Sequence, residues 1–156
     1  MRILGIDPGY GKLGWSVIEK NQQLVDFGVI ETDSDLTISE RLYIIHTKLI
    51  DIIRLHQPDC AAIEKLFFVN NITTGIDVAK TIGAVILTLR LHNISYSEYA
   101  PSQIKQAITG YGRADKEQMK FMIKSIFKLK ELPSPDDAAD ALAIAFCHSL
   151  KSKIPQ

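Results

Sequence analysis

The sequence is short of cysteine, and it holds neither a long apolar run nor an excess of charge of either sign. Its two cysteines, Cys60 and Cys147, are far apart and each has apolar neighbours, so we expect neither a disulfide framework nor a cysteine-based zinc site. No uninterrupted apolar run approaches the ~18–20 residues of a membrane helix. The N-terminus reaches Asp7 and Pro8 before a signal-peptide core forms. We therefore expect a soluble protein of the cytoplasm with no membrane partner.

The composition is that of an ordinary globular domain. Apolar residues make up 46% of the chain and charged residues 23%, which excludes a disordered chain, collagen and a coiled coil. The length of 156 residues suits one domain and is too short for two substantial ones. The chain contains no repeat, low-complexity segment or linker. We predict a single domain over residues 1–156, with a short basic tail at 151–156.

The charges cancel over the whole chain but are unevenly distributed. Residues 101–130 hold seven lysines and arginines against two acids, whereas residues 131–150 hold four acids and no lysine or arginine. A basic block beside an acidic cluster suits a protein that holds a polyanion next to metal-binding carboxylates. The same pattern is typical of a solvated lysine face on a surface helix, and charge alone favours that second interpretation.

The pattern of apolar and turn-forming residues predicts the order βββαβαβ, followed by helices. Consecutive strands followed by alternating strands and helices indicate an α/β fold, with a mixed sheet and helices on both faces. The strands are expected at residues 2–6, 14–20, 24–32, 60–63 and 94–99. The first two helices are expected from a Thr37–Glu40 capping box to Pro58 and over about 73–91. Three more are expected from a cap at Ser102 to Gly110, from a cap at Asp115 to about Lys128, and from a cap at Ser134, with Pro135 in the first helical position, to about Leu150.

Four acidic residues lie at the ends of these elements. Asp7 ends the first strand and Glu64 the fourth, while Asp137 and Asp140, three residues apart, project from one face of the last helix. If the first and fourth strands are neighbours, Asp7 and Glu64 end side by side, and the last helix can bring its pair to the same place. Four carboxylates without His or Cys suit Mg²⁺ or Mn²⁺. Two such ions can stabilise the attacking and leaving oxygens of phosphodiester hydrolysis.

Taken singly, the four carboxylates differ in how well a purely structural interpretation accounts for them. Asp7-Pro8-Gly9 is ordinary turn chemistry, and Asp137 suits the capping of a helix that begins after Ser134. Asp140, in an alanine-rich apolar stretch, needs a partner or a metal. For Glu64, which follows three apolar residues, a functional role is favoured.

Five motifs of the sequence occur in a characteristic order and spacing. They are Gly5-Ile6-Asp7-Pro8-Gly9 with Gly14, Ala62-Ile63-Glu64-Lys65-Leu66-Phe67, Lys105 within Gln-Ile-Lys-Gln-Ala, Gly110-x-Gly112 followed by Lys116, and Asp137-Ala-Ala-Asp140-Ala. Together they resemble the bacterial RuvC family of Holliday junction resolvases, over residues 2–150. The resemblance implies a ribonuclease-H-like α/β fold, with a five-stranded mixed sheet whose first three strands are antiparallel and with helices on both faces.

The resemblance also implies the roles of individual residues. The four acids would be the catalytic quartet, holding two Mg²⁺ ions per subunit with Mn²⁺ as a substitute. Lys105 and Lys116 match DNA-contacting lysines. Arg113 is not part of that match, but it lies in the same basic block and is expected to neutralise a further phosphate. Phe67 matches an aromatic that stacks on unpaired bases; of Phe67 and Phe68, we expect one to be buried and one exposed.

The activity implied is resolution of four-way junctions in recombination and repair by paired symmetric nicks from a homodimer, with the RuvA and RuvB branch-migration proteins as partners. The helix over residues 73–91 has more apolar positions than one core-facing stripe needs. It is therefore expected either at a twofold interface or between the sheet and the C-terminal helices.

Three alternatives remain. They are a ribonuclease-H-like nuclease acting on RNA or RNA–DNA hybrid, an actin-like sugar kinase or ATPase, which needs roughly twice this length, and a noncatalytic junction-binding protein.

Overall fold

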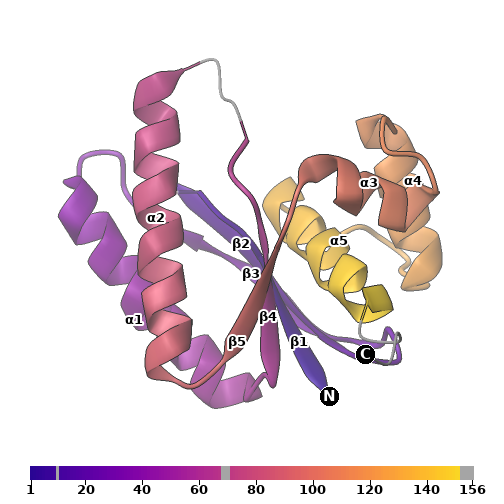
Figure 1. The fold of residues 1–156 in the computed structure, drawn as a ribbon, viewed down its shortest axis with the longest axis horizontal. Coiled ribbons are helices and arrows are strands. Elements are labelled where there is room, and N and C mark those ends of the chain that lie inside the picture. Colours follow the sequence, from indigo (N-terminus) through magenta and orange to yellow (C-terminus); the bar gives the residue numbers. More distant parts are fainter. Residues whose placement is uncertain (10, 68–70, 152–156) are drawn as a thin grey trace.

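The computed structural model describes residues 1–9, 11–67 and 71–151. Across these ranges, strands and helices follow one another in the order that the sequence predicts (Figure 1). The strands are β1 (Arg2–Asp7), β2 (Lys12–Glu19), β3 (Leu24–Glu31), β4 (Cys60–Glu64) and β5 (Ser95–Tyr99), and the helices are α1 (Ile38–His56), α2 (Ile72–Leu91), α3 (Pro101–Thr109), α4 (Lys116–Ile126) and α5 (Asp136–Lys151).

The strands form one mixed sheet in the order β3-β2-β1-β4-β5. The first three strands follow one another through short connections and pair antiparallel. β4 lies parallel to β1, and β5 parallel to β4, because α1 and α2 provide the crossover connections. The antiparallel and parallel halves of the sheet therefore meet at β1, and the predicted fold class is confirmed.

Helices cover both faces of the sheet. α1 and α2 lie on one face, and α3, α4 and α5 on the other (Figure 1). Side chains along β1 alternate between the two cores: Leu4 and Ile6 pack with α1, and Ile3 packs with α5. The C-terminal helices therefore do not enclose α2, and one of the two positions expected for that helix is excluded.

Capping residues explain where the helices begin, with two corrections. The Thr37–Glu40 capping box opens α1, and Asp115 caps α4 through the backbone N–H of Gln118, as predicted. The predicted cap at Ser102 is wrong, because α3 already begins at Pro101, with Ala100 as its N-cap. A proline fits the first turn of a helix because the N–H it lacks would have no intrahelical partner there. The predicted first helical position of Pro135 is also wrong, because α5 begins at Asp136.

The exclusion of a membrane-length apolar segment does not hold for α2. This 20-residue helix is, by length and composition alone, apolar enough to cross a membrane, and it is the one helix of that kind among the residues described. One third of its most apolar window, 33%, is buried within the molecule. Val85 and Leu89 belong to that part and pack in the core shared with α1.

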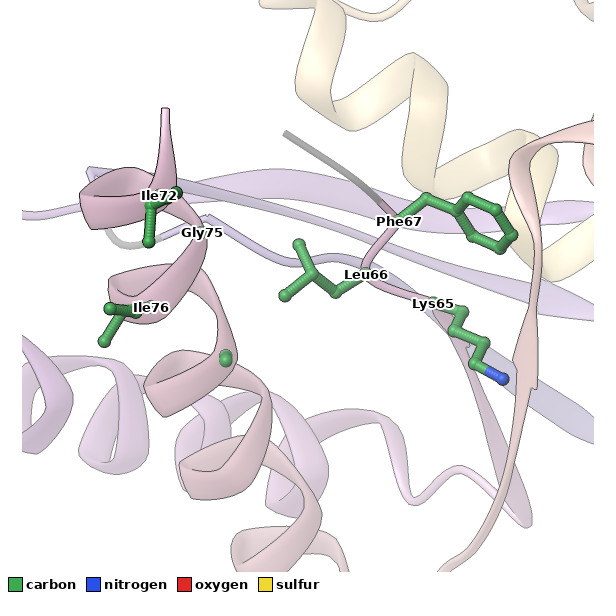
Figure 2. Close-up of a pocket in the computed structure, with 7 residues that line it drawn as sticks. Lys65, Leu66, Phe67, Ile72, Gly75 and Ile76 are labelled. Carbon is green, nitrogen blue, oxygen red and sulfur yellow. The ribbon is translucent and has the colours of Figure 1, made fainter. Parts of the chain in front are cut away.

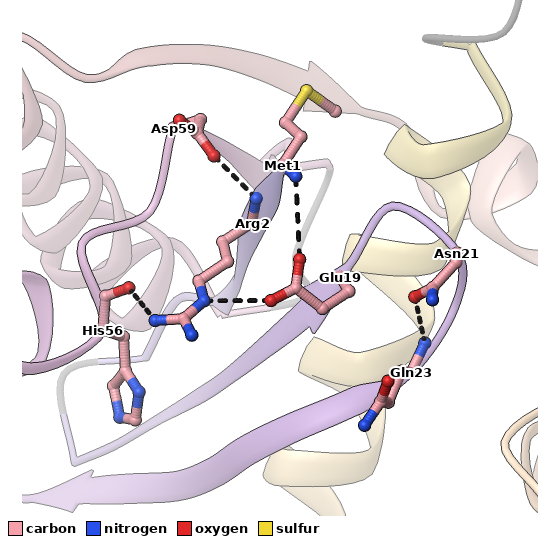
Figure 3. Close-up of polar contacts among 7 residues, drawn as sticks. All are labelled: Met1, Arg2, Glu19, Asn21, Gln23, His56 and Asp59. Carbon is pink, nitrogen blue, oxygen red and sulfur yellow. Dashed lines mark hydrogen bonds and ion pairs between the residues drawn. The ribbon is translucent and has the colours of Figure 1, made fainter.

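Arg2 fixes the N-terminal end of β1 against its neighbours (Figure 3). Its backbone N–H donates to the carboxylate of Asp59 at 2.7 Å, and its guanidinium donates to Glu19 at 3.0 Å and to the carbonyl of His56 at 2.8 Å. These contacts tie β1 to β2 and to the residues before β4. The C-terminal ends of β1 and β4, which carry Asp7 and Glu64, consequently emerge in register.

Candidate active site

Parallel pairing of β1 and β4 brings Asp7 and Glu64 together. Gly5 pairs with Ala62 and Ile6 with Ile63, so the next residue of each strand is one of the two acids. Parallel strands end at the same edge of a sheet, where α/β proteins place their binding sites. The backbone N–H of Lys65 donates to the carbonyl of Tyr99 at 2.8 Å, which keeps the chain paired with β5 just after Glu64.

Two glycines let α5 approach the sheet closely enough to bring Asp137 and Asp140 to the same edge. A Cβ atom on Gly14, the residue paired with Asp7, would overlap the backbone carbonyl of Asp137. A Cβ atom on Gly5 would overlap the carbonyl of Ala141. The backbone of α5 thus rests directly on β1 and β2, and its first turn lies over Gly14 of β2, beside the end of β1.

The carboxylates are close enough to perturb one another. Burial, and then the negative charges of Glu64, Asp140 and Asp137, raise the pKa of Asp7 to about 8. A hydrogen bond between Asp7 and Glu64 favours the protonated form of Asp7. Burial and the charge of Asp140 also raise the pKa of Glu64, while the Asp7 hydrogen bond and Lys105 act against that rise. The four predicted acids therefore form one electrostatic cluster.

A cleft of about 360 Å³ opens beside this cluster, between the end of β4 and helices α3, α4 and α5. Glu64 and Asp140 line it together with Lys105 from α3 and Lys116 from α4. Partial desolvation raises the pKa of Asp140, although its side chain keeps solvent-exposed surface, and the charge of Lys116 opposes the rise. Two predicted phosphate-binding lysines and two predicted catalytic acids thus line one cleft.

Lys116 makes an ion pair that the sequence does not predict. Its ammonium lies 2.9 Å from one carboxylate oxygen of Asp136, and the ammonium of Lys120 lies 3.7 Å from the other. Asp136 directly precedes Asp137, at the start of α5. The sequence gives no signal for this contact, because α4 and α5 meet only in the folded chain.

Phe67 and Arg113 lie outside the cleft. Phe67 is 57% exposed, and its side chain points away from α2, whereas Leu66 points toward α2 (Figure 2). Arg113 is exposed in the loop between α3 and α4. Exposure of Phe67 agrees with half of the expectation for the Phe67–Phe68 pair; Phe68 lies outside the described residues.

The donor set fits a divalent cation of the Mg²⁺ type. Every member is a carboxylate, and such hard oxygen ligands suit Mg²⁺ or Mn²⁺ rather than zinc. A cation would also relieve the repulsion that raises the pKa of Asp7. In the part of the chain that the structure describes, no three His, Cys, Asp or Glu side chains are already arranged as the ligands of one metal ion.

Comparisons with known proteins agree with this arrangement. A family model described as "Crossover junction endodeoxyribonuclease RuvC" matches residues 3–148. The protein of that name from Caldicellulosiruptor saccharolyticus is 51% identical, over 97% of this chain and 94% of its own length. The one from Petrotoga mobilis is 49% identical, over 95% of this chain and 93% of its own length. The structure described as "T. thermophilus RuvC in complex with Holliday junction substrate" superposes with a TM-score of 0.92 at 32% identity, over 98% of this chain and 95% of that one. This chain, with its ribonuclease-H-like fold, therefore belongs to the RuvC family of crossover junction endodeoxyribonucleases.

Proposed function

We propose that this protein cuts four-way DNA junctions by paired symmetric nicks, in recombination and repair, and that Asp7, Glu64, Asp137 and Asp140 are its catalytic residues. The observation that carries the proposal is the convergence of these acids from β1, β4 and α5 beside a cleft that also holds Lys105 and Lys116. The neighbouring structure with a Holliday junction substrate, similar over nearly its whole length, supports this choice of DNA.

The four acids are proposed to hold two Mg²⁺ ions per subunit, with Mn²⁺ as a substitute. When bound, such ions stabilise the attacking and leaving oxygens of phosphodiester hydrolysis. The chain's own contribution is to hold four carboxylates at one sheet edge with rigid elements. Gly5 and Gly14 fix the distance of α5 from β1, and the pairing of β1 with β4 fixes Asp7 relative to Glu64.

Cationic side chains around the cleft would hold the DNA backbone. Lys105 and Lys116 line the same cleft as Glu64 and Asp140, so a phosphate bound there would have positive charges beside it that offset the repulsion of the carboxylates. Arg113, in the adjoining loop, would bind a further phosphate. Phe67, exposed beyond Glu64 and turned away from α2, would stack on unpaired bases near the centre of the junction.

An exposed apolar stripe on α2 supports the proposed homodimer. Ile72, Ile76, Leu87 and Leu91 are 77%, 51%, 58% and 63% exposed. Their intervals of four, eleven and four residues return to one side of a helix with 3.6 residues per turn. Gly83 lies on the same side, and a Cβ atom there would meet no neighbouring atom. A twofold partner is the usual way to cover such a stripe.

The homodimer has a direct test. Sedimentation of the protein at micromolar concentration is expected to give twice the chain mass of 17.4 kDa. A 17.4 kDa monomer that still makes paired nicks would contradict the proposal.

Family membership further supports RuvA and RuvB as partners, and the cytoplasm as the place where this chain meets chromosomal DNA. Cleavage of a hybrid duplex but not a four-way junction would favour the alternative nuclease activity. Junction binding without cleavage in any divalent ion would favour the noncatalytic alternative.

One gel assay tests the central proposal. A labelled four-way junction is incubated with the protein in Mg²⁺, in Mn²⁺ or in EDTA, beside an RNA–DNA hybrid of the same sequence. We expect two symmetric nicks in the junction with either ion, none in EDTA, and an intact hybrid. Asp7→Asn, Glu64→Gln and Asp140→Asn should abolish cleavage while leaving junction binding largely intact, because the carboxamide keeps the shape but loses the charge that holds a cation. Full cleavage by Asp7→Asn would contradict the proposed mechanism.

A further inference from the structure

Asp136 connects two lysines of α4 to the start of α5. Its two carboxylate oxygens lie 2.9 Å from the ammonium of Lys116 and 3.7 Å from that of Lys120. The two lysines are four residues apart on α4 and therefore lie on the same side of that helix. Lys116 also lines the cleft beside Asp140. One carboxylate thus pairs with two lysines, one of which lines the cleft of the candidate active site.

This contact has a direct consequence for phosphate binding. A DNA phosphate that approaches Lys116 must replace Asp136 as the partner of the ammonium, or accept a carboxylate beside it. Replacing Asp136 costs the existing ion pair, and leaving it in place brings two negative charges together. Both options therefore make the free energy of binding less favourable. The side chains of Lys116 and Asp136 are 62% and 54% exposed, so the ion pair is weak enough for a phosphate to displace.

We propose that Asp136 is an internal competitor for DNA phosphates, which occupies Lys116 and Lys120 in the free protein and thereby weakens the binding of the junction. This inference rests on the proposed function, in which the lysines near the cleft contact the DNA backbone. The role differs from that of the neighbouring Asp137, because Asp136 acts on the lysines of α4 and lies outside the proposed catalytic quartet.

The proposal predicts a gain of affinity when the competing charge is removed. Asp136→Asn keeps the size of the side chain and frees both lysines. At low salt we expect about 3- to 30-fold tighter junction binding, as one to two surface contacts between opposite charges are gained. The slope of log K against log salt should become steeper by about one to two, since each additional phosphate contact releases counterions.

The experiment measures the affinity of a fluorescent four-way junction, and of a linear duplex with the same arm sequence, over a range of salt concentrations in EDTA, so that no strand is cut. Glu117→Gln is the matched control, because it removes one negative charge from the first turn of α4 itself. A second set introduces Asp136→Asn into a Lys116→Ala/Lys120→Ala background. Thermal unfolding establishes that each variant is folded.

Three results together support the proposal: tighter binding by Asp136→Asn, a clearly smaller gain by Glu117→Gln, and less than a twofold effect of Asp136→Asn once both lysines are absent. An equal gain in the lysine-free background would overturn it, since net charge alone would then explain the effect. Weaker or unchanged binding by Asp136→Asn would also overturn it. If wild-type protein fails to prefer the junction over the duplex, the proposed function fails, whereas a lysine-dependent gain on both DNAs still supports the role of Asp136.

Discussion

Replacing Asp7 by Asn is expected to stabilise the metal-free protein while destroying its activity. Asp7 lies where burial and three neighbouring carboxylates disfavour its negative charge. The amide of Asn is close in shape to the protonated acid, and its NH₂ group can donate to Glu64 as the protonated Asp7 does. The variant would therefore keep the local contacts and lose only the cost of a buried charge.

The magnitude follows from the pKa. The pKa of Asp7 rises from 3.8 to about 8. At about 1.4 kcal/mol per pKa unit, a change of this size sets an upper bound of about 6 kcal/mol. Relaxation and coupling within the carboxylate cluster reduce the expected gain to about 1–3 kcal/mol, or roughly 3–10 °C in Tm for a domain of this size.

The sign of the pH dependence is fixed by the direction of the shift. A group whose pKa is raised in the folded state stabilises the fold fully below its unfolded pKa, and loses that contribution as the pH rises toward its folded pKa. The wild-type protein and Asp7→Asn should therefore be equally stable near pH 4. The variant should gain stability relative to the wild type between about pH 4 and pH 8, and the difference should level off above that range.

The measurement is urea unfolding in EDTA at a fixed protein concentration over this pH range. Glu31→Gln, an exposed carboxylate at the end of β3, is the control and should show no comparable gain. Adding Mg²⁺ should stabilise the wild type more than Asp7→Asn, since a cation that binds the folded state alone stabilises it. If Asp7→Asn is less stable than the wild type at pH 8 in EDTA, the inference that repulsion between carboxylates destabilises this edge of the sheet is refuted.

Three further changes test other parts of the structure. Gly14→Ala should cost about 1–3 kcal/mol of unfolding free energy and at least tenfold in cleavage rate, because its Cβ atom would displace the first turn of α5; wild-type cleavage would contradict the close contact. The double variant Lys105→Ala/Lys116→Ala should bind junctions more weakly and lower the salt slope by about one to two, and an unchanged slope would exclude a DNA face at the cleft. Thr37→Ala should cost about 1 kcal/mol in urea unfolding through the lost cap of α1 and leave cleavage unchanged; undiminished stability would mean that the capping box contributes little.

Much of the fold could be predicted because its determinants are local in sequence. The continuous apolar run of β1 and the capping box at Thr37 lie within a few residues of the structure that they specify. The errors are local too. Proline and serine lie next to each other at the start of both α3 and α5, yet α3 begins at its proline, Pro101, whereas α5 begins only after Pro135. The difference depends on how each helix packs on the rest of the molecule.

The sequence by itself determined the order of the elements, the position of each acid at the end of an element, and the family resemblance that groups those acids. Only the tertiary structure decided how they meet. The parallel pairing of β1 with β4 and the contact of α5 with Gly5 and Gly14 join segments more than 50 residues apart. Tertiary structure also decided the ion pair between Lys116 and Asp136, which joins two separate helices. It likewise decided the free face of α2, which is exposed because α3, α4 and α5 cover the opposite side of the sheet. Such contacts arise from packing between distant segments, which a periodic pattern within one segment does not specify.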